Sequence, residues 1–309
     1  MTLAPELAAR AEGDVDPPAG AEAQPEERRR SAWRVVLGTR RGKVGLGICA
    51  VMVALVFLGP VIAPFSSTQI GTGPVGAGPS GAHLFGTDEL GRDVFSRVLA
   101  GGTFVLVLPL VANVIASLIG GALGIWGAYE GGRIDTVVTR TFDVLLALPP
   151  LLMVLVIIAG LGSSTGVILL AMAFFFIPRA GRVLRGAAQR VVAEDYVAAS
   201  EAFGERTWAI LWRDVLPNMI SPAIADFALR TTYGIIFVAT LSFLGLGTQP
   251  PKADWGLMVA ENRSLLTTNP LAVLGPIAAI ALLAISINLI ADAVSGSLSG
   301  ARAEGEVLL

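Results

Sequence analysis

Long apolar segments separated by short polar ones dominate the pattern of this 309-residue chain. A helix needs about 20 mostly apolar residues to cross a bilayer. Six segments meet that length: Val44–Pro64, Thr103–Gly127, Val137–Gly160, Thr165–Leu184, Met219–Gly245 and Leu271–Ser295. The fourth is the least apolar, because Arg179 and Arg182 fall near its end, where long side chains can reach the membrane surface. The pattern therefore predicts an all-α polytopic membrane protein with about six transmembrane helices.

Basic residues are distributed unevenly between two sets of connecting segments. The N-terminal tail, the loop after the second span, the end of the fourth span with its following loop, and the C-terminal tail hold 8, 2, 6 and 1 of them, which is 17 of 22. Lys and Arg concentrate on the cytoplasmic side of membrane proteins. We therefore expect both termini in the cytoplasm. The expected plan is a largely disordered cytoplasmic tail at 1–43, a membrane domain at 44–300 and a cytoplasmic tail at 301–309.

Composition excludes several other classes of function. Only 15% of the residues are charged and the mean hydropathy is +0.71, whereas soluble chains carry about 25% charged residues. A net charge of −2 gives no support for nucleic-acid binding. One cysteine, Cys49, and one histidine, His83, cannot form a common zinc site. No phosphate-binding loop or nucleophile motif is present, so we expect no metal site, no bound cofactor and no catalytic residue. His83 is predicted to be a surface loop residue.

The segment between the fourth and fifth spans, residues 191–216, predicts two short helices joined at a glycine. Glu194 and Asp195 suit a helix N-terminus, and Gly204 is a residue that commonly ends helices. Pro217 indicates a further break before the fifth span. The second helix carries an apolar stripe made of Trp208, Leu211, Trp212 and Val215. These residues alone leave two interpretations open: an interfacial helix pair that caps the bundle, or a protrusion that docks on a soluble partner.

This segment resembles the coupling loop of ABC importer permeases, which reads Glu-Ala-Ala, three residues, Gly, nine residues, Ile, one residue, Leu-Pro. Ala198 replaces the Glu of that pattern, Ser200 the second Ala and Asp214 the Ile. The spacing is kept throughout. The resemblance implies an ATPase-coupling loop that includes Ala199, Ser200, Glu201, Gly204, Leu216 and Pro217.

Three further stretches are similar to the dipeptide, oligopeptide and nickel importer permeases, and specifically to the second permease subunit of those systems. They are HLFGTDELGRDVFSR at 83–97, RTFDVLLALPPLL at 140–152 and LSFLGLGTQPPKADWG at 241–256. The similarity covers roughly residues 40–295 in the same order. It implies the type I ABC importer permease fold and a role in peptide uptake. Import of glutathione or of a nickel chelate remains the alternative within the same family.

The resemblance also implies a set of partners. These are a second permease subunit in a heterodimer, two ATPase subunits that bind ATP and Mg, an extracytoplasmic substrate-binding protein, and the lipid of a bacterial cytoplasmic membrane. Two outer segments are candidates for contact with the binding protein. Their residues are Asp88, Glu89, Arg92, Asp93 and Trp255. The simpler interpretation of the acidic group is a solvated helix start, and that of the tryptophan is a position at the lipid–water boundary.

Charged and amide side chains inside the spans have few environments open to them, because lipid tails solvate them poorly. Asp226 and Arg230 are four residues apart on one helical face, so they predict either an internal ion pair or a polar lining of the transport pathway. Asp143 is expected to pair with Arg140. We expect the two span asparagines to form hydrogen bonds between helices; they are Asn113 and Asn288.

Two rival functions fit a polytopic chain. An ion-coupled secondary transporter often shows inverted repeats, and the sequence shows no convincing repeat. A membrane enzyme would need a catalytic constellation near the spans, and none is apparent in the sequence.

Overall fold

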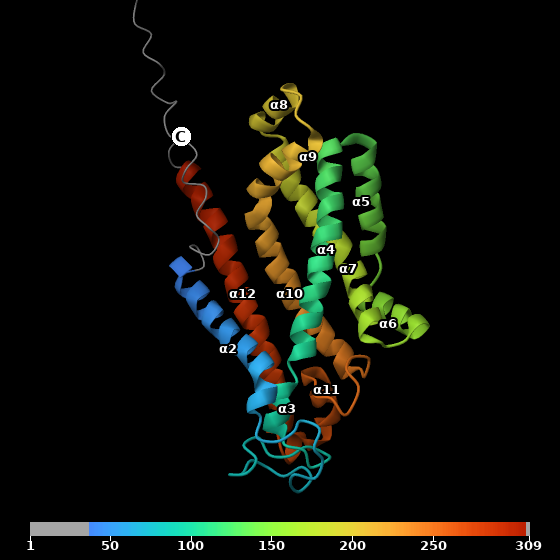
Figure 1. Cartoon of the computed structure of the whole chain (residues 1–309), viewed down its shortest axis with the longest axis vertical. Helices are drawn as coiled ribbons and strands as arrows, with labels where there is room; N and C mark the ends of the chain where they lie inside the picture. The colour runs from blue at the N-terminus through green and yellow to red at the C-terminus, as the bar shows by residue number, and fades with distance from the viewer. Residues whose placement is uncertain (1–36, 307–309) are drawn as a thin grey trace, which may run out of the picture.

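The structure, a computed structural model, describes residues 37–306 and the side chains as far as residue 295. Within that range the chain forms helices and loops and no β-strand. Most of the predicted N-terminal tail lies outside the described residues. Long helices run alongside one another and form a bundle (Figure 1). The short helices α3 (Val94–Ala100), α8 (Asp195–Ala202), α9 (Thr207–Ile210) and α11 (Trp255–Glu261) lie at its two ends.

Five predicted spans appear as long apolar helices. They are α2 (Arg40–Ile62), α4 (Thr103–Glu130), α7 (Thr165–Val192), α10 (Ile220–Phe243) and α12 (Leu271–Glu306). α7 continues eight residues beyond the predicted end of the fourth span, and α12 continues beyond Ser295. The polar ends of both helices extend the bundle past its apolar part.

The third predicted span, Val137–Gly160, is not one straight helix. α5 (Gly132–Leu146) and α6 (Pro150–Leu161) meet at an angle of 82°. Pro150 is the first residue of α6, where a missing N–H costs nothing, while Pro149 before it holds an extended backbone. The two adjacent prolines thus explain why the predicted third span is a bent pair of helices and not one straight helix.

Glycines let α4 and α7 approach each other closely. A methyl group at Gly120 or Gly124 would lie under 3.0 Å from a backbone oxygen of α7, that of Ile177 or of Gly181. Small residues four apart allow such contact between membrane helices. α5 then packs its Phe142 ring over Gly181, which holds α5 against the same pair.

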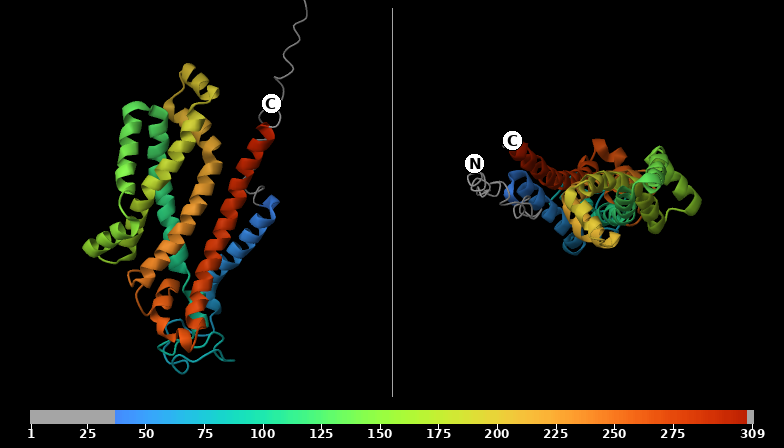
Figure 2. Two further views of the ribbon diagram at one scale, coloured as in Figure 1. Left: turned by 180° about the vertical axis from the view of Figure 1, so that it is seen from behind. Right: turned by 90° about the horizontal axis from the view of Figure 1, so that it is seen from above.

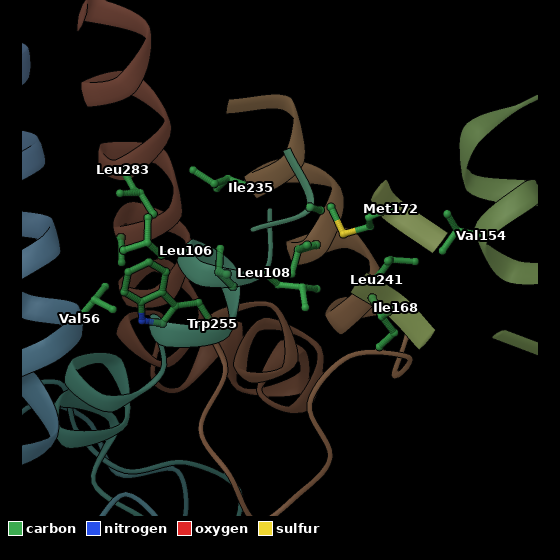
Figure 3. Packing of buried hydrophobic residues seen from close by; sticks show 14 of the residues in the cluster. Val56, Leu106, Leu108, Val154, Ile168, Met172, Ile235, Leu241, Trp255 and Leu283 are labelled. Atoms are coloured by element: carbon green, nitrogen blue, oxygen red, sulfur yellow. The ribbon is translucent and has the colours of Figure 1, made fainter. Parts of the chain in front are cut away.

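The main core surrounds Trp255, whose side chain is fully buried. Figure 3 shows its ring between Val56 of α2, Leu106 of α4 and Leu283 of α12. The indole Nε1 donates to the carbonyl of Val98 at 2.7 Å, so the polar atom of this large side chain is satisfied inside the core. The sequence suggested a lipid–water boundary position for Trp255, and the structure corrects this.

The bundle has two distinct ends and two distinct sides. We call the end that carries α8 the α8 end, and the opposite end, with α3, α11 and the long loop before α3, the loop end (Figure 1). α2 lies beside α12 on one side, and α5 with α6 lies on the other (Figure 2).

Candidate coupling surface and buried charge clusters

α8 and the turn after it protrude from the α8 end of the bundle (Figure 1). Ala199 and Glu201 on α8 are exposed, and Val197 is buried against the bundle. Phe203, which caps the helix, is 85% exposed. Its ring therefore contributes little to packing within the chain.

Gly204 adopts φ +73 directly after α8. Side chains with a Cβ strain this left-handed backbone, and glycine does not. Space is not the constraint, because an added Cβ would meet nothing within 4 Å. The predicted glycine turn is therefore present, and its requirement for glycine is conformational.

The chain after this turn is helical without interruption from Thr207 to Phe243. α9 passes into a π-helical turn, η2 (Leu211–Val215), then a 3-10 turn, η3 (Leu216–Met219), and then α10. Pro217 stands in the first turn of η3, where proline is tolerated. The predicted break at Pro217 is thus a change in helical winding, and the helix continues through it.

The predicted apolar stripe after the turn divides into two rows. Leu211 and Val215 are buried in a small cluster that includes Val197 of α8 and Leu184 of α7. The other row is exposed, with Trp208 at 72% and Trp212 at 66%. The predicted stripe therefore does not form one continuous buried face. One row packs against the bundle and the other is exposed, which corrects the prediction.

Two departures from the coupling-loop pattern contact each other. Ser200 Oγ on α8 donates to Asp214 Oδ2 on η2 at 3.1 Å. Arg213 in turn donates to Glu205 at 2.6 Å and to Asp214 at 3.1 Å. Polar bonds therefore connect α8 to the following helix at the positions where the family pattern has Ala and Ile.

Asp226 and Arg230 form the predicted ion pair, with Arg230 Nε donating to Asp226 Oδ2 at 2.7 Å. Arg230 Nη2 also donates to Ser117 Oγ of α4 at 3.0 Å. The guanidinium is almost fully buried, so the pair joins α10 to α4 inside the chain. The sequence analysis did not identify Ser117, because it lies 113 residues from Arg230 along the chain and no local pattern connects the two.

Other polar residues of the spans have partners that differ in part from the prediction. Asp143 pairs with Arg182 of α7, and Arg140 is not its partner. Asn113 forms the expected interhelical bonds, donating to the Phe227 carbonyl at 2.7 Å and to Thr231. Asn288 is exposed on α12 instead of bonding between helices.

His83 at the loop end is buried, which corrects its predicted surface position. Its Nδ1 lies 2.8 Å from Asp93 Oδ1, and its Nε2 lies 3.2 Å from the Thr72 carbonyl. Asp93 also caps α3 through the backbone N–H of Ser96. The loop before α3 is therefore folded around this pair.

Asp88 and Asp93 of the acidic group near α3 are also buried, so the prediction of a solvated helix start is wrong for them. Asp88 accepts from Arg92 Nε at 2.6 Å and lies 3.5 Å from Arg97 Nε. Both arginines donate to Glu261 of α11 at 2.9 Å. Only Glu89 of the predicted contact residues is exposed, and it accepts from Ser264. In this structure the other four, Asp88, Arg92, Asp93 and Trp255, are closed to direct contact with a partner.

Asp254 caps the N-terminus of α11 and is fully buried beside Trp255. Its Oδ1 accepts from the backbone N–H of Leu257 at 3.0 Å. Burial raises the pKa of this carboxyl to about 6. Among the described residues no group of three or more His, Cys, Asp and Glu side chains is placed to hold a metal ion.

A bundle of membrane-length helices with a protruding helix–glycine–helix connection is the architecture of a polytopic membrane protein. The profile of the family described as binding-protein-dependent transport system inner membrane component matches residues 120–300. The chain therefore belongs to this family, which supplies the permease components of ABC importers of the bacterial inner membrane.

Curated relatives agree with this assignment. The chain is 36% identical to a glutathione transport system permease protein of Pectobacterium atrosepticum, over 68% of this chain and 70% of the relative. It is 38% identical to a probable D,D-dipeptide transport system permease protein of Escherichia coli, over 67% and 70%. It is also 32% identical to a dipeptide transport system permease protein of Alkalihalophilus pseudofirmus, over 87% and 88%.

Proposed function

We propose that this chain is one of two permease subunits in an ATP-driven importer of peptides, and that the α8 end docks on a separate ATPase. The observation that carries the proposal is the connection of α8 through Gly204 to a single helical run from Thr207 to Phe243. A movement imposed on α8 would reach the membrane-spanning part of α10 through this run. Peptides are the proposed cargo because relatives are named as dipeptide and glutathione permeases.

ATP hydrolysis is proposed to occur in two partner ATPase subunits, with ATP and Mg bound there. Ala199, Glu201 and Phe203 would contact an ATPase because they are exposed on the protrusion. Leu216 and Pro217 would transmit the motion, because they lie where the winding changes. The α8 end would then be cytoplasmic, in agreement with the larger number of Lys and Arg in the segments assigned to that side.

The loop end would face the substrate-binding protein on the opposite side of the membrane. Ion pairs join its buried charges to one another, and of the predicted contact residues Glu89 is the exposed one that could meet this partner. The pathway would form between this chain and a second permease subunit. Asp226 and Arg230 are proposed to hold α10 against α4 next to that pathway, because they bond to each other and to Ser117 of α4 within this chain.

Gly204 provides the test of coupling. Gly204→Ala is expected to strain the turn by about 1 kcal/mol, to leave membrane insertion unchanged, and to lower peptide uptake per ATP hydrolysed in proteoliposomes that contain the whole complex. Gly186→Ala is the matched control, because this α7 glycine has open space and no positive φ.

Normal uptake per ATP by Gly204→Ala would refute the coupling role. Uptake by the purified chain alone, without any ATPase, would refute the whole proposal and favour the ion-coupled alternative. Uptake of glutathione in preference to dipeptides would change the proposed cargo from dipeptides to glutathione and leave the proposed coupling unchanged.

A further inference from the structure

His83 is a buried residue of the long loop before α3, at the loop end of the bundle (Figure 1). A short turn sets its position, because the Ser80 N–H donates to the His83 carbonyl at 2.8 Å and the His83 N–H donates to Ser80 Oγ at 3.1 Å. The imidazole packs against the Phe65 ring, with 5.1 Å between the two ring centroids. Backbone bonds and packing therefore both fix the place of this imidazole.

Both ring nitrogens of His83 face oxygen atoms. Nδ1 lies 2.8 Å from Oδ1 of Asp93, and Nε2 lies 3.2 Å from the carbonyl oxygen of Thr72. A Cβ at Gly73 would lie 2.8 Å from Nε2, so the missing side chain of this glycine lets the loop backbone approach the ring. Since Asp93 is the N-cap of α3, the imidazole joins the loop to the start of that helix.

The two oxygens at the ring are both acceptors. The Thr72 carbonyl has no proton to donate. Oδ2 of Asp93 accepts from the Ser96 N–H at 2.8 Å and from the Ser96 hydroxyl at 2.7 Å, as an ionised carboxylate does. A neutral imidazole has one N–H and one lone pair, so it would turn a lone pair towards one of the two oxygens. The imidazolium has two N–H donors and satisfies both contacts.

One charged group contacts the ring among the described residues, and it is Asp93. The neighbours of the ring from the loop are uncharged, and they are Phe65, Thr72 and Gly73. The other buried charges of this end pair among themselves, and they are Asp88, Arg92, Arg97 and Glu261. A proton on His83 therefore makes a neutral pair with Asp93, and its loss leaves the carboxylate without a cation.

We propose that His83 is a proton-dependent latch: the doubly protonated ring ties the 72–83 segment to the N-cap of α3, and loss of one proton releases this segment. The closed loop binds more protons than the open loop, so a rise in pH favours the open loop. Imidazole is the side chain whose charge ordinarily changes between about pH 5 and 8. The proposed function places this end outside the cytoplasm, where changes in the pH of the surroundings reach it. The latch itself does not depend on that function.

Hydrogen exchange in the full chain in detergent tests the latch. The reporters are the Thr72 and Gly76 N–H groups, which donate to the Gly91 and Asp88 carbonyls across the closed loop. Their protection factors, which correct for the pH dependence of chemical exchange itself, should fall about tenfold between about pH 5 and 8, because one hydrogen bond of the ring is lost. Equal protection at the two pH values would overturn the latch.

Two substitutions assign the response to one residue. His83→Gln cannot gain a second donor by protonation, so the protection of the same N–H groups should not change with pH. Asp254→Asn is the control, because burial raises the pKa of Asp254 to about 6 and this acid also changes its charge in the range. The tenfold change should persist in Asp254→Asn. A change that persists in His83→Gln and vanishes in Asp254→Asn would overturn the assignment to His83.

A second measurement needs no substitution. His83 is the one histidine of the sequence, so nitrogen-15 labelling of histidine in a chain with a histidine-free tag gives NMR signals of this ring alone. At about pH 5 both ring nitrogens should carry a proton, and the loss of one should follow the same pH curve as the loss of protection. A ring that loses its proton while the loop stays protected would overturn the latch. Neither measurement involves transport, so failure of the latch and failure of the proposed function are distinguishable.

Discussion

Arg97 and Glu261 lie 164 residues apart in the chain, and Nη2 of Arg97 donates to Oε2 of Glu261 at 2.9 Å. Arg92 donates to the same oxygen at 2.9 Å. One carboxylate of α11 therefore holds two buried arginines that flank the start of α3. This contact connects the loop after the first span to the loop after the fifth and makes the loop end a single unit.

Removing the charge of Glu261 should destabilise this unit strongly. Glu261→Gln leaves Asp88 as the one carboxylate near two buried guanidinium groups. We expect the free energy of unfolding to fall by about 3 kcal/mol, measured by thermal unfolding in detergent. Glu89→Gln, which changes an exposed acid of the same end, should have little effect. Equal stability of the two variants would contradict the buried network.

Asp254 should make stability depend on pH. Burial raises its pKa from 3.8 to about 6, so between these values the folded state binds more protons than the unfolded state. The free energy of unfolding should therefore fall as pH rises from about 4 to 6, by about 3 kcal/mol in total.

Asp254→Asn can keep the cap to the Leu257 N–H and cannot ionise. Its stability should vary less over this pH range than that of the unsubstituted protein. The comparison of unfolding curves at pH 4.5 and 7 decides the point, and parallel pH dependences in the two proteins would contradict the assignment to Asp254.

Asp226 and Arg230 provide a test by charge exchange. Asp226→Asn leaves Arg230 buried without its carboxylate and should cost about 3 kcal/mol. Exchanging the two residues restores an ion pair at the same spacing, and the Ser117 hydroxyl can donate to the new carboxylate. We expect the exchange to restore most of the folded yield and uptake lost in the single variant. Restored folding without restored uptake would favour a direct role of the two charges in the pathway.

Ser200 and Asp214 are expected to act together. The variants Ser200→Ala and Asp214→Ile, which restore the family pattern, should each speed hydrogen exchange in α8, because each breaks the 3.1 Å bond. The double variant should exchange no faster than the single variants, with a coupling energy of about 1 kcal/mol. Additive effects would show that the two residues act separately.

Hydropathy and charge alone predicted much of this protein. Five spans, the position of the polar loop before α10 and the glycine turn at Gly204 follow from local properties: apolar length, periodicity and a backbone that glycine adopts easily. Pro149 and Pro150 also indicate the bend after α5. The prediction of one span missed it because the residues around the two prolines are apolar for the length of a span. The coupling-loop spacing was visible because it is contained in one short segment.

Tertiary structure decided the properties that depend on distant partners. Periodicity placed Trp208 and Leu211 on one stripe, but the neighbours of that helix determined which row is buried. His83, Asp88 and Trp255 looked exposed in the sequence, and each is buried. Trp255 donates to the carbonyl of Val98, 157 residues away, and Arg92, the partner of Asp88, donates to Glu261, 169 residues away. Such contacts depend on how helices pack across the whole bundle, so no window along the chain contains the information that determines them.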